Sequence, residues 1–158
     1  MEAPTGDLHA HIGIARLDIT PPAGIHWKLW GASLADTAEG VHRPLTATAM
    51  AILGDGEPLE VVSLDVCEWS DPADEGVVRH RILSACGLDP DRLLLHSTHT
   101  HSGQAPCTSN VALTGGEYIG EHLEMIAERA ATAVARAVDS AEPSVLSWGV
   151  GHCGLAAH

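Results

Sequence analysis

The sequence predicts an α/β domain, a layered sandwich in which helices pack on a mixed sheet. Short apolar runs bounded by proline and glycine predict strands, and two longer segments with apolar residues at helical spacing predict helices. In chain order these elements read β, ββ, α, β, α, β. With 158 residues, 45% of them hydrophobic, the chain fits one domain with one core. Residues 149–158 contain no clear stop signal, so the domain is expected to be incomplete.

Strands are expected at residues 12–19, 45–53, 59–66 and 145–150, with a further strand that begins at Leu93. Pro21 and Pro22 close the first strand, because proline cannot donate a hydrogen bond to a neighbouring strand. The glycine-rich turn at residues 54–58 joins the second and third strands into a hairpin.

Two helices follow from capping and periodicity. Asp71 is expected as the N-cap of the first helix, Pro72 as its first helical residue and Gly87 as the residue just past its end. The second helix is expected at residues 117–138, after a loop at residues 103–116. Its apolar stripe has helical spacing. The stripe consists of Ile119, Leu123, Ile126, Ala130, Val134 and Ala137.

Charge and composition narrow the class of partner. A formal net charge of −13 argues against nucleic acid and anionic membrane surfaces. No apolar run is long enough to span a bilayer, and the first residues lack the features of a signal peptide. The chain as given is therefore expected to be cytoplasmic, or exported if a signal segment lies upstream. The four cysteines form no Cys-x-x-Cys pair, which favours reduced, mostly structural thiols.

The segment after Leu93 carries the strongest functional signal. It reads Leu-Leu-Leu-His-Ser-Thr-His-Thr-His-Ser-Gly over residues 93–103. Alternate residues of a strand face one side, so His99 and His101 would point together if the strand continues. Two imidazoles at a strand end commonly begin a divalent metal site, and the alternative is a polar loop with solvated histidines. His96 points the other way and is interpreted as a core histidine.

Two further polar residues could belong to the same site, and two tryptophans could line a pocket. His42 precedes a strand and could lie near the same strand ends. Asp65 ends an apolar strand, where a carboxylate often orients a ligand histidine. The alternative for Asp65 is a carboxylate that the backbone satisfies at the strand end. Trp27 and Trp30 lie in a long connection, where they would line a pocket or pack over the sheet edge.

Four segments also fit together as a set: residues 13–24 (GIARLDITPPAG), 40–47 (GVHRPLTA), 62–65 (VSLD) and 98–103 (THTHSG). In this order and spacing they resemble the N-terminal part of the neutral/alkaline, non-lysosomal ceramidase family. The resemblance implies that residues 1–158 are the N-terminal portion of a ceramidase-like catalytic domain. It also implies a zinc-dependent amidase that cleaves ceramide or a related small, lipid-like N-acyl substrate.

Site residues follow from the same resemblance. It implies His99 as a zinc ligand, and His101 as a second active-site histidine that contacts substrate or orients the metal-bound water. The other ligands that it implies, a His, a Glu and a Tyr, have no matching positions in this chain. A catalytic zinc takes about three protein ligands and a water, which it activates while polarising the carbonyl. His101, or a group outside the chain, could deliver the proton that the leaving nitrogen needs.

Two alternatives remain. A different metallohydrolase with His-x-His on a strand, such as a barrel amidohydrolase, would need repeated βα units, and the hairpin argues against it. A non-catalytic domain would keep the fold and lose the chemistry. Because several ligands are missing, residues 1–158 alone are expected to be inactive. An exposed edge strand and exposed apolar surface would also favour self-association.

Overall fold

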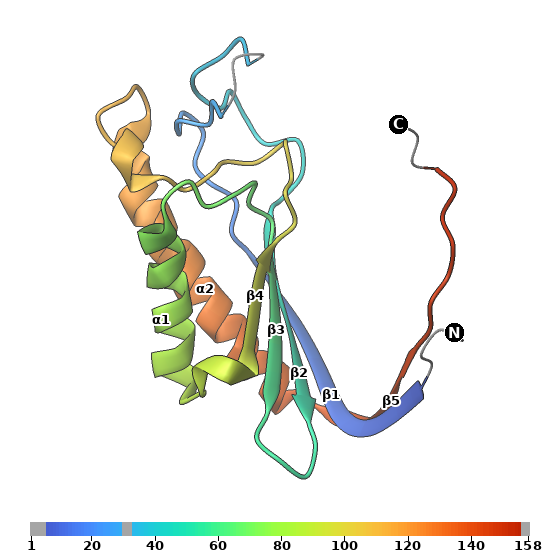
Figure 1. Ribbon diagram of the computed structural model, residues 1–158. Coiled ribbons are helices and arrows are strands. Elements are labelled where there is room, and N and C mark those ends of the chain that lie inside the picture. The colour runs from blue at the N-terminus through green and yellow to red at the C-terminus, as the bar shows by residue number, and fades with distance from the viewer. Residues whose placement is uncertain (1–5, 30–32, 156–158) are drawn as a thin grey trace.

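A computed structural model describes residues 6–29 and 33–155. It contains one five-stranded sheet with the strand order β4-β3-β2-β1-β5, and two α-helices (Figure 1). The strands are β1 (Gly6–Asp18), β2 (Thr46–Leu53), β3 (Leu59–Leu64), β4 (Leu93–Ser97) and β5 (Glu142–Trp148). The helices are α1 (Pro72–Cys86) and α2 (Ile119–Asp139). The predicted α/β class and element order are confirmed.

The sheet is mixed, as predicted. Strand β1 pairs antiparallel with both β2 and β5, and β2 also pairs antiparallel with β3. Only β3 and β4 run parallel among the described strands, with Ser63 opposite His96. Helix α1 is the crossover between these two strands, as parallel neighbours require. The carboxyl ends of β3 and β4 therefore lie side by side at one end of the sheet.

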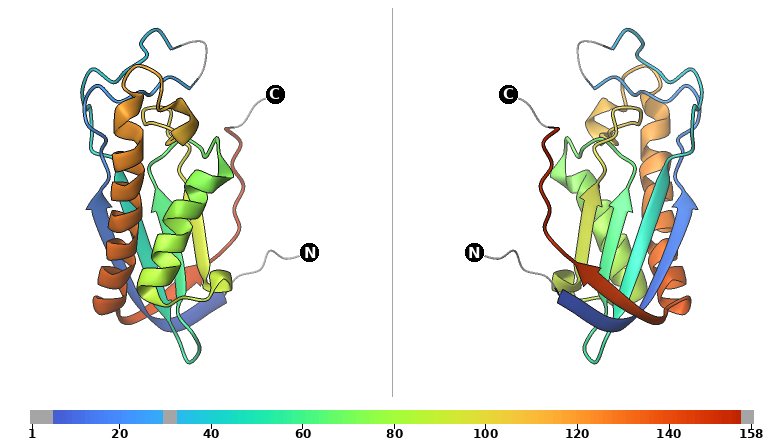
Figure 2. Two further views of the ribbon diagram at one scale, coloured as in Figure 1. Left: turned by 90° about the vertical axis from the view of Figure 1, so that its left-hand side faces the viewer. Right: turned by 90° about the vertical axis from the view of Figure 1, so that its right-hand side faces the viewer.

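Both helices cover the same face of the sheet, and Figures 1 and 2 show the opposite face without a second layer. The core lies between the sheet and the helices, where the fully buried residues of strand β2 have small side chains. Ala47, Ala49 and Ala51 are all fully buried, which lets α2 approach the sheet closely. On the opposite face Ile14 is 63% exposed and Leu94 is 57% exposed. This face therefore presents apolar side chains to solvent.

The first and last strands differ from the sequence prediction. Strand β1 begins at Gly6 rather than at residue 12, because residues 6–12 pair with β5. Strand β5 begins at Glu142 and includes Pro143. Proline is tolerated there because β5 forms an edge of the sheet, where one side of the strand has no partner. A sequence read one strand at a time does not reveal this pairing.

The helix caps follow the prediction closely. Asp71 caps α1 by accepting a 2.8 Å hydrogen bond from the Ala73 N–H, and Pro72 opens the helix. Gly87 adopts the left-handed conformation at its end, with φ 64°. Helix α2 begins at Ile119, two residues later than predicted, because a 3₁₀ turn (Gly116–Tyr118) precedes it. Among the described residues, no helix combines the length and the apolar character needed to span a membrane.

Two buried polar contacts hold the connecting segments at the end of the sheet where β3 and β4 finish. The Asp74 carboxylate in α1 accepts hydrogen bonds from the Thr108 N–H and hydroxyl at 3.0 and 2.8 Å. The His122 imidazole in α2 donates from Nε2 to the Ile19 carbonyl at 2.8 Å. Burial lowers the pKa of His122, which keeps the ring neutral. Both contacts fix the loops that surround the histidine segment.

Candidate metal centre

The histidine segment lies at the carboxyl ends of the parallel strands. The Thr98 N–H still pairs with the Leu64 carbonyl at 2.9 Å, but β4 itself ends at Ser97. The predicted alternation required the strand to continue to His101, and the strand does not continue that far. His99 instead has φ 59°, a left-handed conformation that few non-glycine residues adopt. Residues held in such a conformation cluster at functional sites, because the surrounding structure must enforce it.

A backbone contact fixes the orientation of the His99 ring. Its Nδ1 lies 2.9 Å from the Cys67 carbonyl oxygen, which can only accept a hydrogen bond. The proton therefore sits on Nδ1, and Nε2 keeps the lone pair with which imidazole binds a metal. Histidine ligands in metal sites commonly donate their other N–H to a carbonyl in this way. The ring is also exposed to solvent, so an ion could reach it.

Cys67 lies three residues beyond the end of β3 and is only 1% exposed. Its N–H donates to the Gln104 carbonyl at 3.3 Å, and its Sγ lies 3.8 Å from His99 Nδ1. Burial raises the pKa of the thiol, and the nearby Glu68 charge raises it further. Without a metal the sulfur is therefore protonated.

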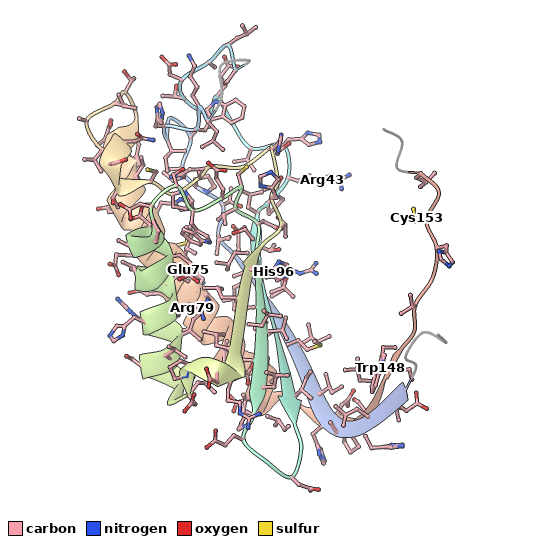
Figure 3. All side chains as sticks on the ribbon, viewed as in Figure 1. Arg43, Glu75, Arg79, His96, Trp148 and Cys153 are labelled. Carbon is pink, nitrogen blue, oxygen red and sulfur yellow. The ribbon has the colours of Figure 1, made fainter. Side chains whose placement is uncertain are left out.

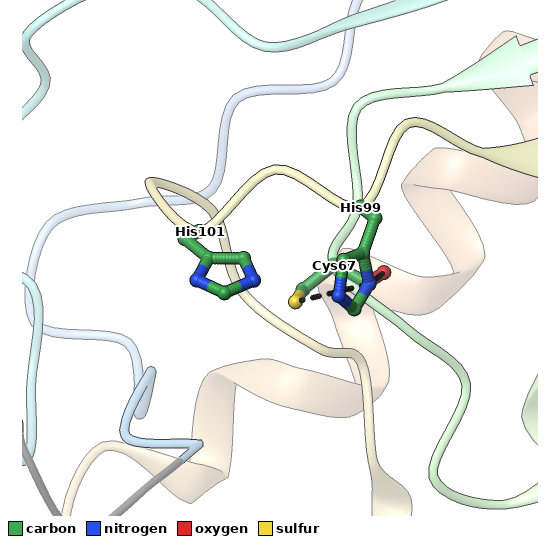
Figure 4. A group of neighbouring side chains, drawn as sticks. All are labelled: Cys67, His99 and His101. Atoms are coloured by element: carbon green, nitrogen blue, oxygen red, sulfur yellow. Dashed lines mark hydrogen bonds between the residues drawn. The ribbon is translucent and has the colours of Figure 1, made fainter. Parts of the chain in front are cut away.

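His101 completes the group from the other side. Its ring centroid lies 5.0 Å from that of His99, with the two rings at 76°. One ligand atom each of Cys67, His99 and His101 lie within 4.8 Å of one another, and Figure 4 shows the sulfur between the two rings. This group could hold a metal ion. Its nitrogen and sulfur donors suit zinc, whereas magnesium and calcium prefer oxygen.

The sequence does not single out Cys67 as a site residue. The four cysteines form no Cys-x-x-Cys pair, so the pattern predicts mostly structural thiols. The predicted strand, helix, strand order could have indicated Cys67. A helical crossover makes β3 and β4 parallel neighbours, so the residues just past the two strands lie close together. Cys67 and His99 are separated by the whole of α1 in sequence and are adjacent in space.

A pocket of about 270 Å³ borders the histidine segment. Three connections form its walls: residues 20–27, 38–45 and 100–104. Apolar side chains dominate it, with Pro22, Ile25 and Leu45 among them. Thr100 and Ser102, the two neighbours of His101, also line it. The pocket is therefore suited to an apolar group of a ligand that reaches the histidines.

The other predicted site residues have varied surroundings. His42 and Trp27 line this pocket, whereas Trp30 lies outside the described residues. The Asp65 carboxylate accepts hydrogen bonds from the Thr46 N–H and hydroxyl at 2.9 and 2.8 Å, so it is satisfied at the sheet end. The core assignment of His96 is wrong: its side chain is exposed on the outer face of β4 (Figure 3). No described element covers that face.

The fold and the metal-binding group can be set beside known proteins. No protein-family model matches the sequence, and no curated protein matches it either. The crystal structure of neutral ceramidase from Pseudomonas aeruginosa is similar, with a TM-score of 0.66 and 22% identity over 90% of this chain. A ceramidase complexed with C2 has a TM-score of 0.65 and 20% identity over 89% of this chain. The chain thus has the fold of part of a neutral ceramidase, and it spans 23% and 22% of those two chains.

Proposed function

We propose that this chain is the N-terminal portion of a zinc-dependent hydrolase that cleaves the amide bond of a lipid-like N-acyl substrate. The observation that carries the proposal is the group of Cys67, His99 and His101 at the ends of two parallel strands. The adjoining apolar pocket and the ceramidase-like fold support the choice of substrate class. Ceramide is the substrate that the resemblance implies, and related N-acyl compounds share its apolar chain and amide.

The residues of the chain divide the chemistry among them. Zinc bound here would activate a water and polarise the amide carbonyl. His99 would hold the ion through Nε2, because the Cys67 carbonyl keeps the proton on Nδ1. His101 would carry a proton to the leaving nitrogen, since an amine is a poor leaving group until it is protonated. The pocket would hold the apolar chain and position the amide beside the histidines.

Replacing His99 with alanine should abolish zinc binding. The change removes the ligand imidazole and one hydrogen bond to a backbone carbonyl, so the fold should lose no more than about 1.5 kcal/mol. Zinc per chain in a longer polypeptide that contains residues 1–158, measured by atomic emission after dialysis, should fall to background. His96→Ala is the matched control, because His96 is an exposed histidine of the same segment outside the metal group. Unchanged zinc content in the His99 variant would refute the assignment.

Replacing His101 with alanine should lower amide hydrolysis without weakening the fold. The assay needs a longer polypeptide that contains this chain, since residues 1–158 alone are expected to be inactive. Turnover of a fluorogenic N-acyl substrate should drop about 10²–10⁴-fold, the usual contribution of proton transfer by a side chain. The melting temperature should stay within a few degrees. A loss of stability of roughly 2–5 kcal/mol would instead give His101 a structural role.

The non-catalytic alternative makes a different prediction for the same assay. A domain that has lost the chemistry would show no chelator-sensitive turnover, whether or not it binds zinc. Hydrolysis that zinc restores after chelation would exclude the non-catalytic alternative.

The open sheet face or an edge strand would also allow self-association, and sedimentation of residues 1–158 would test this.

A further inference from the structure

We propose that Cys67 is itself a metal ligand, and that its thiolate binds the same ion as His99. The site would then be selective for thiophilic metals. This inference rests on the proposed function only for the choice of His99 as a ligand. The ligands that the ceramidase resemblance implies are a pair of histidines, a glutamate and a tyrosine, so a thiolate is a feature of this chain.

The distances agree with two donors on one ion. Bond lengths of roughly 2.3 Å to sulfur and 2.0 Å to nitrogen place the two donors of a tetrahedral zinc roughly 3.5 Å apart. One ligand atom each of Cys67, His99 and His101 lie within 4.8 Å of one another, and the Cys67 Sγ lies 3.8 Å from Nδ1 of the same His99 ring whose Nε2 would bind the ion. A shift of the side chains by a fraction of an ångström to about one ångström would close the site.

The backbone holds the thiol in this position. The Cys67 N–H binds the Gln104 carbonyl, and the Cys67 carbonyl binds His99, so the histidine segment contacts this residue on both sides. The sulfur forms the buried side of the group, while both imidazoles are exposed. An ion bound here would lie between the buried Cys67 sulfur and an imidazole that solvent can reach. Figure 4 shows this arrangement, with the sulfur facing the space between the two rings.

The other cysteines near the core have different surroundings. The Cys107 sulfur lies 3.0 Å from the Ser109 hydroxyl, and the Cys86 thiol donates to the Ala131 carbonyl at 3.7 Å. Neither belongs to a metal-binding group among the described residues. Cys67 and His99 would supply two of the about three protein ligands of a catalytic zinc. His101 then keeps the proton-carrying role.

Cobalt(II) provides a direct test, because a thiolate ligand gives a charge-transfer band in the near ultraviolet that imidazole and water do not. Residues 1–158 titrated with cobalt should show this band. Cys67→Ser should lose it and bind cobalt at least about tenfold more weakly, since even indirect contacts to a metal ligand are worth that much. Cys107→Ser, a buried free cysteine, is the matched control and should keep the band. Excess magnesium should not displace cobalt, whereas zinc should.

A second variant covers the case in which Cys67→Ser does not fold. Serine at positions 86, 107 and 153 leaves Cys67 as the single thiol of the chain, and the band should persist. Cobalt bound through His99 without a thiolate band would overturn this inference and leave the proposed function standing. No binding of cobalt or zinc at all by residues 1–158 would also overturn this inference. The band in the single-thiol variant, lost again on adding His99→Ala, would establish the shared ion.

Discussion

Gly13→Ala should destabilise this protein strongly. A Cβ at this position would lie 1.8 Å from the Ala137 carbonyl oxygen and 2.8 Å from the Ala141 nitrogen. Both are backbone atoms at the end of α2, so no side chain can rotate away. Overpacking usually costs about 1–3 kcal/mol, and a clash with backbone should reach the upper end or exceed it. Urea unfolding should show a loss of about 3 kcal/mol.

The same substitution elsewhere provides the control. Gly76 lies inside α1, and apart from its chain neighbours and the backbone of its own helix no atom lies within 4 Å of the position that a Cβ would take. Alanine favours a helix over glycine, so Gly76→Ala should stabilise the protein by about 1 kcal/mol. Opposite signs for the two variants would show that the approach of α2 to β1 is responsible. If Gly13→Ala were as stable as the wild type, the helix and the strand would not be in backbone contact.

The buried carboxyl of Glu60 should make stability fall as the pH rises. Glu60 is fully buried in β3, and neither of its carboxyl oxygens has a hydrogen-bond partner among the described residues. Burial raises its pKa from 4.5 to about 7, because a buried carboxylate loses the hydration of its charge. Between these values the folded chain holds a proton that the unfolded chain has lost. The free energy of unfolding must therefore decrease with pH across this range.

The magnitude follows from the two pKa values. At roughly 1.4 kcal/mol for each pH unit, the interval corresponds to about 3 kcal/mol. Glu60→Gln removes the titrating group with little change in volume. Its stability relative to the wild type, measured by urea unfolding, should increase by about 2–3 kcal/mol from about pH 5 to about pH 8. All other ionisable groups are shared, so the difference isolates Glu60. An equal difference at both values would show that the Glu60 pKa is not raised.

Local chemistry made much of the fold predictable from sequence. Asp71, Pro72 and Gly87 specify the ends of α1 through their own side chains and backbone preferences, and the structure confirms all three. The turn at residues 54–58 specifies a hairpin for the same reason. The pairing of β1 with β5 was not predictable in this way. It depends on contacts between residues at least 130 positions apart, such as Gly6 and Trp148, and no local pattern encodes them.

The site likewise contains residues that local sequence predicts and residues that depend on long-range pairing. His99 and His101 stand out because they are two positions apart at the end of an apolar strand. Cys67 becomes relevant only once β3 and β4 are known to be parallel neighbours. Strand alternation places His96 on the face opposite to its neighbours, but it does not say which face of the sheet is covered, so the pattern cannot decide whether His96 is buried. Here both helices lie on one side, so the residues on the other side are exposed.

The parallel pair has a consequence for how metal occupancy and folding depend on each other. Strand β3, helix α1 and strand β4 form one βαβ unit, and the proposed ligands all lie at its end. An ion that joins Cys67 to His99 would close a single loop, whose entropy cost grows only slowly with length. Opening of this unit would then require release of the ion, so rising metal concentration would suppress it by mass action. Fraying of β5 at the far edge would proceed as before, because that strand shares no ligand with the unit. Metal supply would thus set the lifetime of one part of the domain while leaving another part unchanged.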